Sequence, residues 1–420
     1  MDINAMLSGV DCACGKRHEC DIQYVYIERG AISRLREICE SYKRILVVAD
    51  TNTFAAAGDK TLSALGEKLY GKVIFDGSKI LIPNEESVET VKAALGESDL
   101  IVGIGSGVIQ DLSKYVSHTT GVPYMVVATA PSMDGYASNG AAMIMGGMKV
   151  TYSAGLPRAI VADTEVIANA PMDMIKAGYG DIVGKYSALN DWKLSNAVNG
   201  EYLCDYIYST TMEMVEKTLT LADGLLLRDE TSVGTLMEAL VVVGILMSFA
   251  GSSRPASGSE HHLSHFFEIV GIVKNEEYFP HGIDVAYSTV ITAKIREQLL
   301  SGEFPKSIYR ESREALTEKL TRIYGSVADG CIALQDKVGN YALDRSGTYL
   351  EKEETVRAIL SEMPTAREIE EMLSKVGLDI SEFYSLYGEK KINEAIAYAK
   401  DLKDRYTVLW VNYDFGRCDK

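Results

Sequence analysis

Four of the six histidines in this chain lie in two neighbouring segments. The first segment reads Glu260-His261-His262-Leu263-Ser264-His265, and the second reads Pro280-His281-Gly282. On a helix His261 and His265 would share one face, whereas His262 would point about 100° away. Imidazole is a common ligand of divalent metals, and two histidines with one carboxylate leave coordination positions open for catalysis. The cluster therefore predicts a catalytic metal centre, with surface or helix-capping histidines as the alternative.

A carboxylate ligand would have to come from another segment. Asp181 is the best candidate, because it follows Gly178-Tyr179-Gly180 at the expected start of a helix. Asp191 is the competitor, but it lies beside Trp192 and no glycines flank it.

A second group of metal-binding residue types stands near the N-terminus, where Cys12, Cys14, His18 and Cys20 fall within nine residues. These side chains could hold zinc, but the spacing differs from a C-x2-C finger and no second half lies nearby. A turn-rich edge hairpin is the alternative. The remaining cysteines are Cys39, Cys204, Cys331 and Cys418, and the odd total of seven favours reduced thiols.

A glycine-rich turn, Gly103-Ile104-Gly105-Ser106-Gly107, follows an apolar run and precedes a helical one. Glycines there let the backbone approach a diphosphate, and the helix start offers unpaired N–H groups. The usual dinucleotide fingerprint places an acidic ribose ligand downstream of the glycines. Here the best acid, Asp50, comes from an earlier strand, where it could bind ribose or cap a helix.

The segment Thr129-Ala130-Pro131-Ser132-Met133-Asp134-Gly135-Tyr136-Ala137-Ser138 follows the next apolar run. The carboxyl ends of parallel strands are where α/β sheets place ligand contacts, so hydroxyls and an acid there favour a binding loop. A plain β-turn has the same composition.

In the first part of the chain, apolar strands alternate with amphipathic helices, and these elements must position Asp50, the glycine-rich turn and the Thr129–Ser138 segment. They predict an α/β domain with a doubly wound, mostly parallel sheet over residues 1–168, with a hairpin at Gly146-Gly147. From about Pro171 the pattern is helical, which predicts an all-α second domain over residues 169–420. The apolar run Thr407–Val411 is the exception and favours a strand. The expected strands span 23–27, 44–50, 72–75, 100–105, 124–128 and 159–162.

Composition limits the partners. The net charge of −17 argues against nucleic acid, although a local cationic pocket could still bind a small anion. No apolar run reaches the roughly 18 residues of a membrane span, and the N-terminus lacks a secretory pattern. We expect a cytoplasmic protein that forms a homodimer.

These motifs together resemble the superfamily of dehydroquinate synthase, glycerol dehydrogenase and iron-dependent alcohol dehydrogenases, over about residues 25–300. The match is closest to the sn-glycerol-1-phosphate dehydrogenase family, through the Ala-Pro-Ser-x-Asp-Gly loop at Ala130–Gly135 and the Arg-Pro-Ala-Ser-Gly-Ser-Glu-His run at Arg254–His261. The family commonly has three consecutive glycines where this chain has Gly105-Ser106-Gly107. The C-terminal hundred residues exceed the shorter relatives, and we assign them no function.

The resemblance implies a residue role at each matching position. It implies one divalent metal (zinc first, nickel or iron otherwise) at Asp181, His261 and His281, and it implies substrate contacts and catalysis at Asp134, Asp181 and His265. NAD(H) or NADP(H) is expected at Asp50, Gly105, Ser106, Gly107, Val108, Ile109, Asp111, Thr129, Ala130, Ser132 and Ser138.

The implied reaction reduces dihydroxyacetone phosphate to sn-glycerol 1-phosphate, a step of phospholipid biosynthesis. The phosphate needs a cation, for which Arg254, Lys149 and Lys185 are candidates. A glycerol or other polyol dehydrogenase is the alternative, and a non-catalytic nucleotide- and metal-binding sensor is the second.

Overall fold

The computed structural model describes residues 2–79, 81–146 and 148–417, so Cys418 lies outside the described residues. Contacts divide the chain into two compact units. Unit 1 comprises Met1–Tyr179 and Glu216–Ser253, and unit 2 comprises Gly180–Val215 and Arg254–Lys420. The predicted domain limit at residue 168 stays a prediction. The division by contacts follows a different criterion, because it also assigns the later helical segment Glu216–Ser253 to unit 1.

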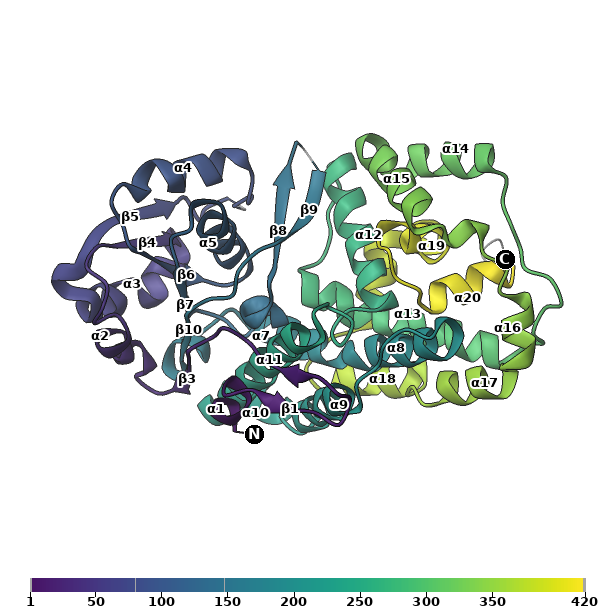
Figure 1. Cartoon of the computed structure of the whole chain (residues 1–420), viewed down its shortest axis with the longest axis horizontal. Coiled ribbons are helices and arrows are strands. Elements are labelled where there is room, and N and C mark those ends of the chain that lie inside the picture. The colour runs from purple at the N-terminus through teal and green to yellow at the C-terminus, as the bar shows by residue number, and fades with distance from the viewer. Residues whose placement is uncertain (1, 80, 147, 418–420) are drawn as a thin grey trace. The chain divides into compact units, whose positions relative to one another are not determined.

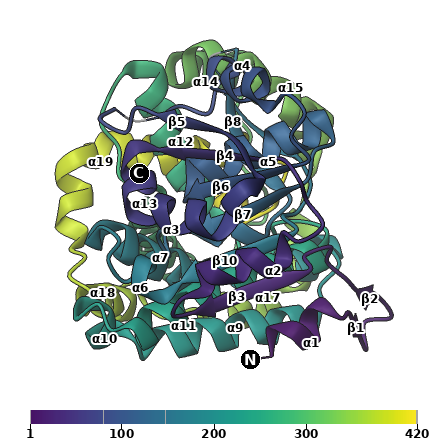
Figure 2. The ribbon, with the colours of Figure 1, turned by 90° about the vertical axis from the view of Figure 1, so that its left-hand side faces the viewer.

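Unit 1 is built on a six-stranded sheet with the order β3-β10-β7-β6-β4-β5, in which all neighbours run parallel. Figures 1 and 2 show these strands with their connecting helices. Strands β6 and β7 are buried along their whole length, as expected for a sheet covered on both faces. The predicted doubly wound parallel sheet is confirmed. The strands are β3 (Tyr24–Glu28), β4 (Ile45–Asp50), β5 (Leu69–Phe75), β6 (Leu100–Gly105), β7 (Tyr124–Ala128) and β10 (Ala159–Asp163).

The helices of unit 1 cover both faces of this sheet. Alternate residues of β6 face opposite sides: Val102 and Ile104 belong to the hydrophobic core that includes Ala57 of α3, whereas Gly103 lies against Ser113 of α5. The helical segments are η1 (Ala31–Arg34), α2 (Leu35–Ile38), α3 (Thr51–Leu65), α4 (Glu85–Leu95), α5 (Gly107–Thr120) and α6 (Thr164–Ile167).

The strand order explains why the acidic candidate precedes the glycine turn in sequence. Val48 of β4 pairs with Gly103 of β6, and Gly105 of β6 pairs with Ala128 of β7. Strands β4, β6 and β7 therefore end at one edge of the sheet. Asp50, the glycine turn and the loop after Ala128 all begin at that edge.

Two hairpins stand outside the main sheet. Strands β8 (Gly140–Met145) and β9 (Met148–Ser153) pair antiparallel, which confirms the hairpin predicted at Gly146. Strands β1 (Val10–Asp11) and β2 (Arg17–His18) form a much smaller antiparallel pair after the short helix α1 (Ile3–Leu7).

Helix α11 (Glu230–Ala250) is the only helix in the described part of the chain that is long and apolar enough to cross a membrane by length and composition. Its sequence is interrupted by Thr235, Glu238 and Ser248, so it is not a continuous apolar run of about 18 residues. Burial accounts for the apolar sequence, because 78% of its most apolar window is buried. Within unit 1 this helix packs closely on the 3₁₀ helix η3 (Asp134–Ala137), and Ser248 Oγ donates a hydrogen bond to the Ala137 carbonyl at 3.1 Å.

The described residues of unit 2 form helices and connecting loops with no β-strand, as predicted. The strand expected at Thr407–Val411 is wrong, because α20 occupies Val408–Asp414. Every residue of α20 is buried, so the segment shows no polar face, and its β-branched residues follow tertiary packing rather than local propensity. Helices α7 (Met172–Val183) and α9 (Asp205–Leu219) contribute residues to both units, and α10 (Ala222–Leu226) belongs to unit 1. The α-helices wholly in unit 2 are α8 (Lys185–Asn199), α12 (Ser259–Lys274), α13 (His281–Ser301), α14 (Arg313–Tyr324), α15 (Ala328–Val338), α16 (Ser346–Glu351), α17 (Glu353–Ser361), α18 (Ala366–Ser374), α19 (Ile380–Tyr398) and α20.

The buried carboxylate of Asp191 on α8 joins several of these helices. It accepts hydrogen bonds from the Ser259 amide at the start of α12 (2.7 Å) and from the Val408 amide at the start of α20 (2.8 Å). Arg296 of α13 donates to the same carboxylate at 2.7 Å. The C-terminal hundred residues therefore pack around α12 and α13, which carry the histidine cluster.

Candidate metal and nucleotide sites

Unit 2 brings together the three side chains that the family resemblance implies as metal ligands. One ligand atom each from Asp181, His261 and His281 lies within 4.8 Å of the other two. Asp181 is near the end of α7, so its expected place at the start of a helix is wrong. His261 is in the first turn of α12, and His281 is the first residue of α13. Asp181 and His261 are buried.

The glycines around Asp181 allow the helices to approach closely enough for this arrangement. A Cβ atom on Gly180 would lie 2.6 Å from the Gly282 carbonyl oxygen, so α7 meets the start of α13 there. A Cβ atom on Gly184 would lie 2.6 Å from Val285 Cγ1 of α13. The small residues noted in the sequence thus hold Asp181 beside His281.

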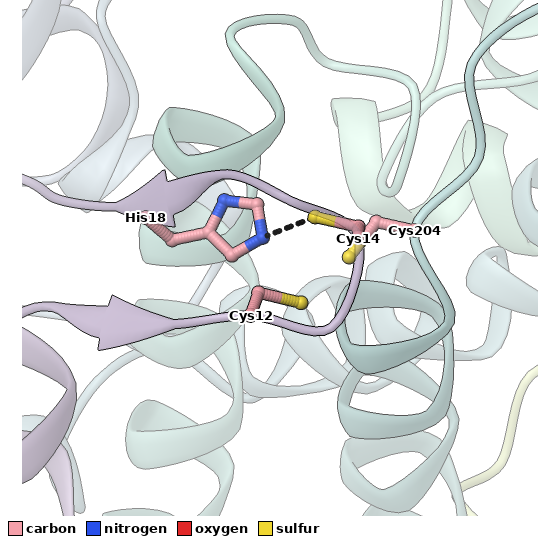
Figure 3. Close-up of side chains that lie close together, drawn as sticks. All are labelled: Cys12, Cys14, His18 and Cys204. Carbon is pink, nitrogen blue, oxygen red and sulfur yellow. Dashed lines mark hydrogen bonds between the residues drawn. The ribbon is translucent and has the colours of Figure 1, made fainter.

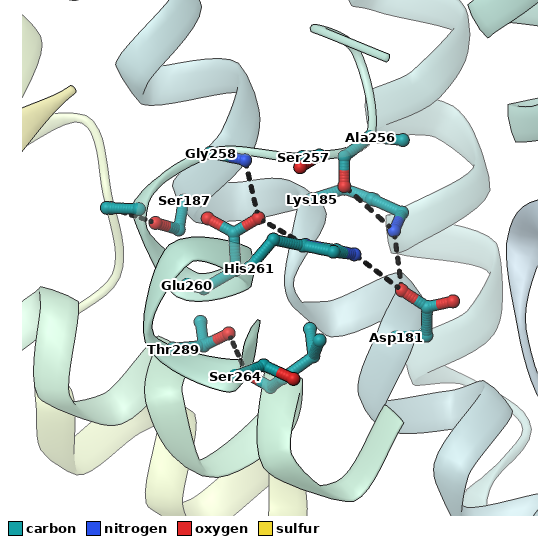
Figure 4. A network of polar contacts seen from close by, with 12 residues as sticks. Asp181, Lys185, Ser187, Ala256, Ser257, Gly258, Glu260, His261, Ser264 and Thr289 are labelled. Carbon is teal, nitrogen blue, oxygen red and sulfur yellow. Dashed lines mark hydrogen bonds and ion pairs between the residues drawn. The ribbon is translucent and has the colours of Figure 1, made fainter. Parts of the chain in front are cut away.

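Glu260 sets the orientation of the His261 ring, and the sequence analysis missed it. Glu260 Oε1 lies 2.7 Å from His261 Nδ1 and accepts a hydrogen bond from the Gly258 amide at 2.8 Å. His261 Nε2 then lies 3.6 Å from Asp181 Oδ1. Figure 4 draws this contact as a dashed line. A carboxylate on the far ring nitrogen is the usual support of a metal-binding histidine. The only sign of this role in the sequence is that Glu260 directly precedes His261, the first histidine of the cluster.

The donor set fits a divalent ion. Metal–nitrogen bonds of about 2.0–2.1 Å in a tetrahedral site separate two ligand atoms by roughly 3.3 Å, close to the observed spacing of His261 and Asp181. Burial raises the pKa of Glu260, and the Gly258 amide opposes that shift by bonding the charged form. When the Nδ1–H group of His261 donates a hydrogen bond to Glu260 Oε1, Nε2 keeps its lone pair and is the atom that can bind a metal.

Lys185 binds Asp181 directly. Its Nζ lies 2.7 Å from Asp181 Oδ1 and 3.1 Å from the Ala256 carbonyl oxygen, with the side chain fully buried (Figure 4). An ionised carboxylate has about four acceptor positions, so this bond leaves room for a metal.

The other two candidates for binding the substrate phosphate are Arg254 and Lys149. Arg254 is ion-paired to Glu201, and the side chain of Lys149 lies outside the described residues.

The other candidates of the cluster lie outside the ligand group. The His265 ring lies 5.5 Å from the His281 ring and 6.1 Å from the His261 ring, between centroids. His262 is fully buried, and burial holds its pKa well below the ordinary value, which keeps the ring neutral. Asp191, the competitor of Asp181, is committed to backbone amides and Arg296.

In unit 1, the glycine turn ends β6 and opens α5. A Cβ atom on Gly105 would lie 2.7 Å from Ile109 Cβ, so this glycine lets α5 pack on the strand. A Cβ atom on Gly107 would meet nothing within 4 Å. Packing does not require that glycine, so its position at the helix start is open for an approaching ligand.

The loop Thr129–Ser138 is held by buried polar groups. Lys114 of α5 donates to the Gly140 carbonyl (2.7 Å) and the Gly135 carbonyl (3.2 Å). Gln110 donates to the Tyr136 carbonyl at 3.0 Å. Burial lowers the pKa of Lys114, and nearby Asp111 opposes that shift. The sequence analysis gave Lys114 and Gln110 no role, yet they fix the loop that carries Asp134.

Two further contacts bear on the expected residues of unit 1. A Cβ atom on Gly178 would lie 1.8 Å from the Pro131 carbonyl oxygen, so only glycine lets α7 pass that loop. Asp50 caps α3, because its Oδ1 accepts from the Asn52 and Thr53 amides at 2.8 and 2.9 Å. The helix cap expected as one alternative is therefore present, and ribose binding stays a prediction.

The chain thus combines a parallel α/β unit, a helical unit and a group of two imidazoles and a carboxylate. A family model described as iron-containing alcohol dehydrogenase matches residues 26–171. A probable glycerol dehydrogenase from Sinorhizobium meliloti has the same fold, with a TM-score of 0.61 at 17% identity, covering 94% of this chain and 96% of that one.

Sequence relatives identify the family more closely. A glycerol-1-phosphate dehydrogenase (NAD(P)+) from Halalkalibacterium halodurans is 30% identical over 80% of this chain and 92% of the relative. One from Bacillus licheniformis is 28% identical over 96% of this chain and 92% of the relative. The chain belongs to the glycerol-1-phosphate dehydrogenase family, as the sequence motifs predicted.

The contact between Glu260 and His261 gives a first prediction. Glu260→Ala should lower the affinity for the active-site metal by about 10- to 100-fold, because His261 loses the group that fixes its ring. Metal titration of the metal-free protein measures this. Glu276→Ala, which removes an exposed carboxylate paired with Lys391, should leave the affinity unchanged. Equal affinities in the two variants would contradict the positioning role of Glu260.

Proposed function

We propose that this protein is a metal-dependent, NAD(P)-linked dehydrogenase that interconverts dihydroxyacetone phosphate and sn-glycerol 1-phosphate. The grouping of Asp181, His261 and His281 in unit 2 carries the proposal, since this donor set suits a catalytic ion with open positions. The names of the relatives supply the substrate and cofactor class. A cytoplasmic location and a role in phospholipid biosynthesis fit this activity.

A divalent ion on this donor set would polarise the carbonyl at C2 of the substrate, and a reduced nicotinamide would supply the hydride. Asp181 and the two imidazoles hold the ion. Zinc is the first choice, with nickel or iron as alternatives, because imidazole and carboxylate accept all three. His265 is one helical turn from His261 and outside the ligand group, so its ring can deliver a proton to the C2 oxygen, directly or through water.

The residues of unit 1 bind the nicotinamide cofactor in this proposal. Backbone amides at the start of α5, from Ser106 to Val108, bind the diphosphate, and the open position at Gly107 admits it. Asp50 bonds ribose through Oδ2, while Oδ1 keeps the helix cap. Asp134 orients a substrate hydroxyl. The other proposed cofactor contacts are Gly105, Ile109, Asp111, Thr129, Ala130, Ser132 and Ser138.

The substrate test compares the oxidation of NADH and NADPH with three additions: dihydroxyacetone phosphate, dihydroxyacetone and buffer alone. Each assay uses protein that has been loaded with zinc, nickel or iron(II). We expect turnover with dihydroxyacetone phosphate and at most weak turnover with dihydroxyacetone, with one metal giving the highest rate.

The other outcomes of this test are equally specific. A preference for dihydroxyacetone would support a polyol dehydrogenase instead. Bound nucleotide and metal without turnover on either substrate would support the sensor alternative. Chiral analysis of the product then shows whether it is sn-glycerol 1-phosphate or its mirror image.

The role of His265 is tested by a variant that leaves the ligands intact. His265→Ala should keep the active-site metal and lose about 10²- to 10⁴-fold in kcat, the usual contribution of a general acid. His118→Ala, at an exposed position on α5, is the control and should retain both. Loss of the metal in His265→Ala would show that His265 is a ligand.

The role of Asp50 is tested by a change that separates charge from capping. Asp50→Asn keeps a good N-cap for α3 but removes the negative charge that opposes a 2′-phosphate. We expect the preference for NADH over NADPH, measured as the ratio of kcat/KM values, to fall in the variant while its thermal stability stays near that of the parent. An unchanged ratio would mean that Asp50 only caps the helix.

A further inference from the structure

The N-terminal hairpin gathers metal-binding side chains for which the proposed reaction has no use. Strands β1 and β2 pair Val10 with His18, and the connecting turn contains Cys12 and Cys14. The Cys12 amide donates to the Lys16 carbonyl at 3.1 Å, and the Gly15 amide donates to the Cys12 carbonyl at 3.0 Å. Gly15 has a φ of +85°, which closes this tight turn.

The turn brings three donor atoms together. The Sγ atoms of Cys12 and Cys14 and a ring nitrogen of His18 lie within 4.8 Å of one another. Cys14 Sγ lies 3.4 Å from His18 Nε2, and Figure 3 shows the His18 ring directed at this thiol. Zinc bonds of about 2.3 Å to sulfur and 2.0–2.1 Å to nitrogen would place such atoms roughly 3.5 Å apart.

The His18 ring is held in the orientation that a metal needs. Its Nδ1 lies 3.2 Å from the Phe249 carbonyl oxygen at the end of α11, and its ring stacks on Phe249 at 5.3 Å between centroids. A carbonyl oxygen only accepts hydrogen bonds, so Nδ1 carries the proton and Nε2 keeps its lone pair towards Cys14. The side chain is 2% exposed. Metal-binding histidines are fixed in this way by a backbone carbonyl on the far nitrogen.

Strand pairing alone contributes little to the stability of this hairpin. Each strand has two residues, and isolated two-stranded hairpins are marginal in water. The ion pair of Arg17 with Asp11 is exposed, and such pairs contribute little. A metal that joins the turn to β2 would close this small unit.

We propose that Cys12, Cys14 and His18 bind a zinc ion at a second, structural site, distinct from the catalytic ion. Sulfur donors select zinc over harder ions, whereas Asp181 and its two histidines offer only oxygen and nitrogen. On binding, each thiol releases its proton to solvent, so two thiolates balance the charge of the ion and the imidazole binds as a neutral ligand. Water or a further thiol completes the coordination.

Cobalt(II) is the probe that separates the two sites, because only thiolates give a sulfur-to-cobalt charge-transfer absorption in the near ultraviolet. The full-length protein and its His261→Ala variant are freed of metal under reducing conditions and titrated with cobalt(II). We expect this absorption in both proteins, saturating at one equivalent in His261→Ala. Zinc should abolish it by displacing the cobalt.

Matched variants assign the absorption to the hairpin. Cys12→Ser and Cys14→Ser should each remove most of it, and His18→Ala should weaken cobalt binding. Cys331→Ser, which alters a buried thiol on α15, should leave it intact. A partial loss in Cys20→Ser or Cys204→Ser would support the site and identify that thiol as an additional ligand.

A stability measurement keeps the proposal independent of catalysis. In the His261→Ala background, zinc should raise the thermal unfolding temperature, and adding Cys12→Ser should cancel that increase. No charge-transfer absorption in the parent protein, or the same absorption in Cys12→Ser and Cys14→Ser, would overturn the proposal. Neither result would bear on turnover of dihydroxyacetone phosphate.

Discussion

The hydrogen bonds of Asp191 are the constraint on which the helical unit depends. One buried carboxylate fixes the start of α12, the start of α20 and the buried Arg296 of α13. Removing one partner of a buried ion pair typically costs about 3–5 kcal/mol, because the other charge is left without compensation. Helices α12 and α13 carry His261 and His281, so this acid, which lies outside the ligand group, helps to position the two histidines.

Close backbone approaches complete that arrangement. Gly180 brings α7 against the start of α13, and Gly178 lets the same helix pass the Pro131 carbonyl. Within each unit, a glycine thus places a chemically active segment at a distance that any side chain would prevent. The buried cations work in the same way: Lys114 fixes the loop of Asp134, and Lys185 fixes the carboxylate of Asp181. An acidic protein can therefore keep positive charge at its functional centres.

Local sequence patterns predicted the parallel sheet and the helical second half, because burial on both faces leaves a direct trace in the sequence. Histidine density pointed to the metal cluster, and the family resemblance selected Asp181, His261 and His281 within it. Contacts between distant segments could not be predicted in this way. Glu260 stands next to His261, but its role depends on the Gly258 turn, and Lys185 shows its role only once Asp181 is placed. The apolar run of α20 was mistaken for a strand, because a fully buried helix has no polar face to reveal its helical period.

The central claim is that Asp181, His261 and His281 hold the ion on which turnover depends. The most direct measurement is the metal content and the dihydroxyacetone phosphate-dependent NAD(P)H oxidation of His261→Ala and Asp181→Ala beside the parent protein. The account predicts that each variant has one equivalent of metal less than the parent and no turnover. A variant that keeps both the full metal content and the parental rate would contradict it.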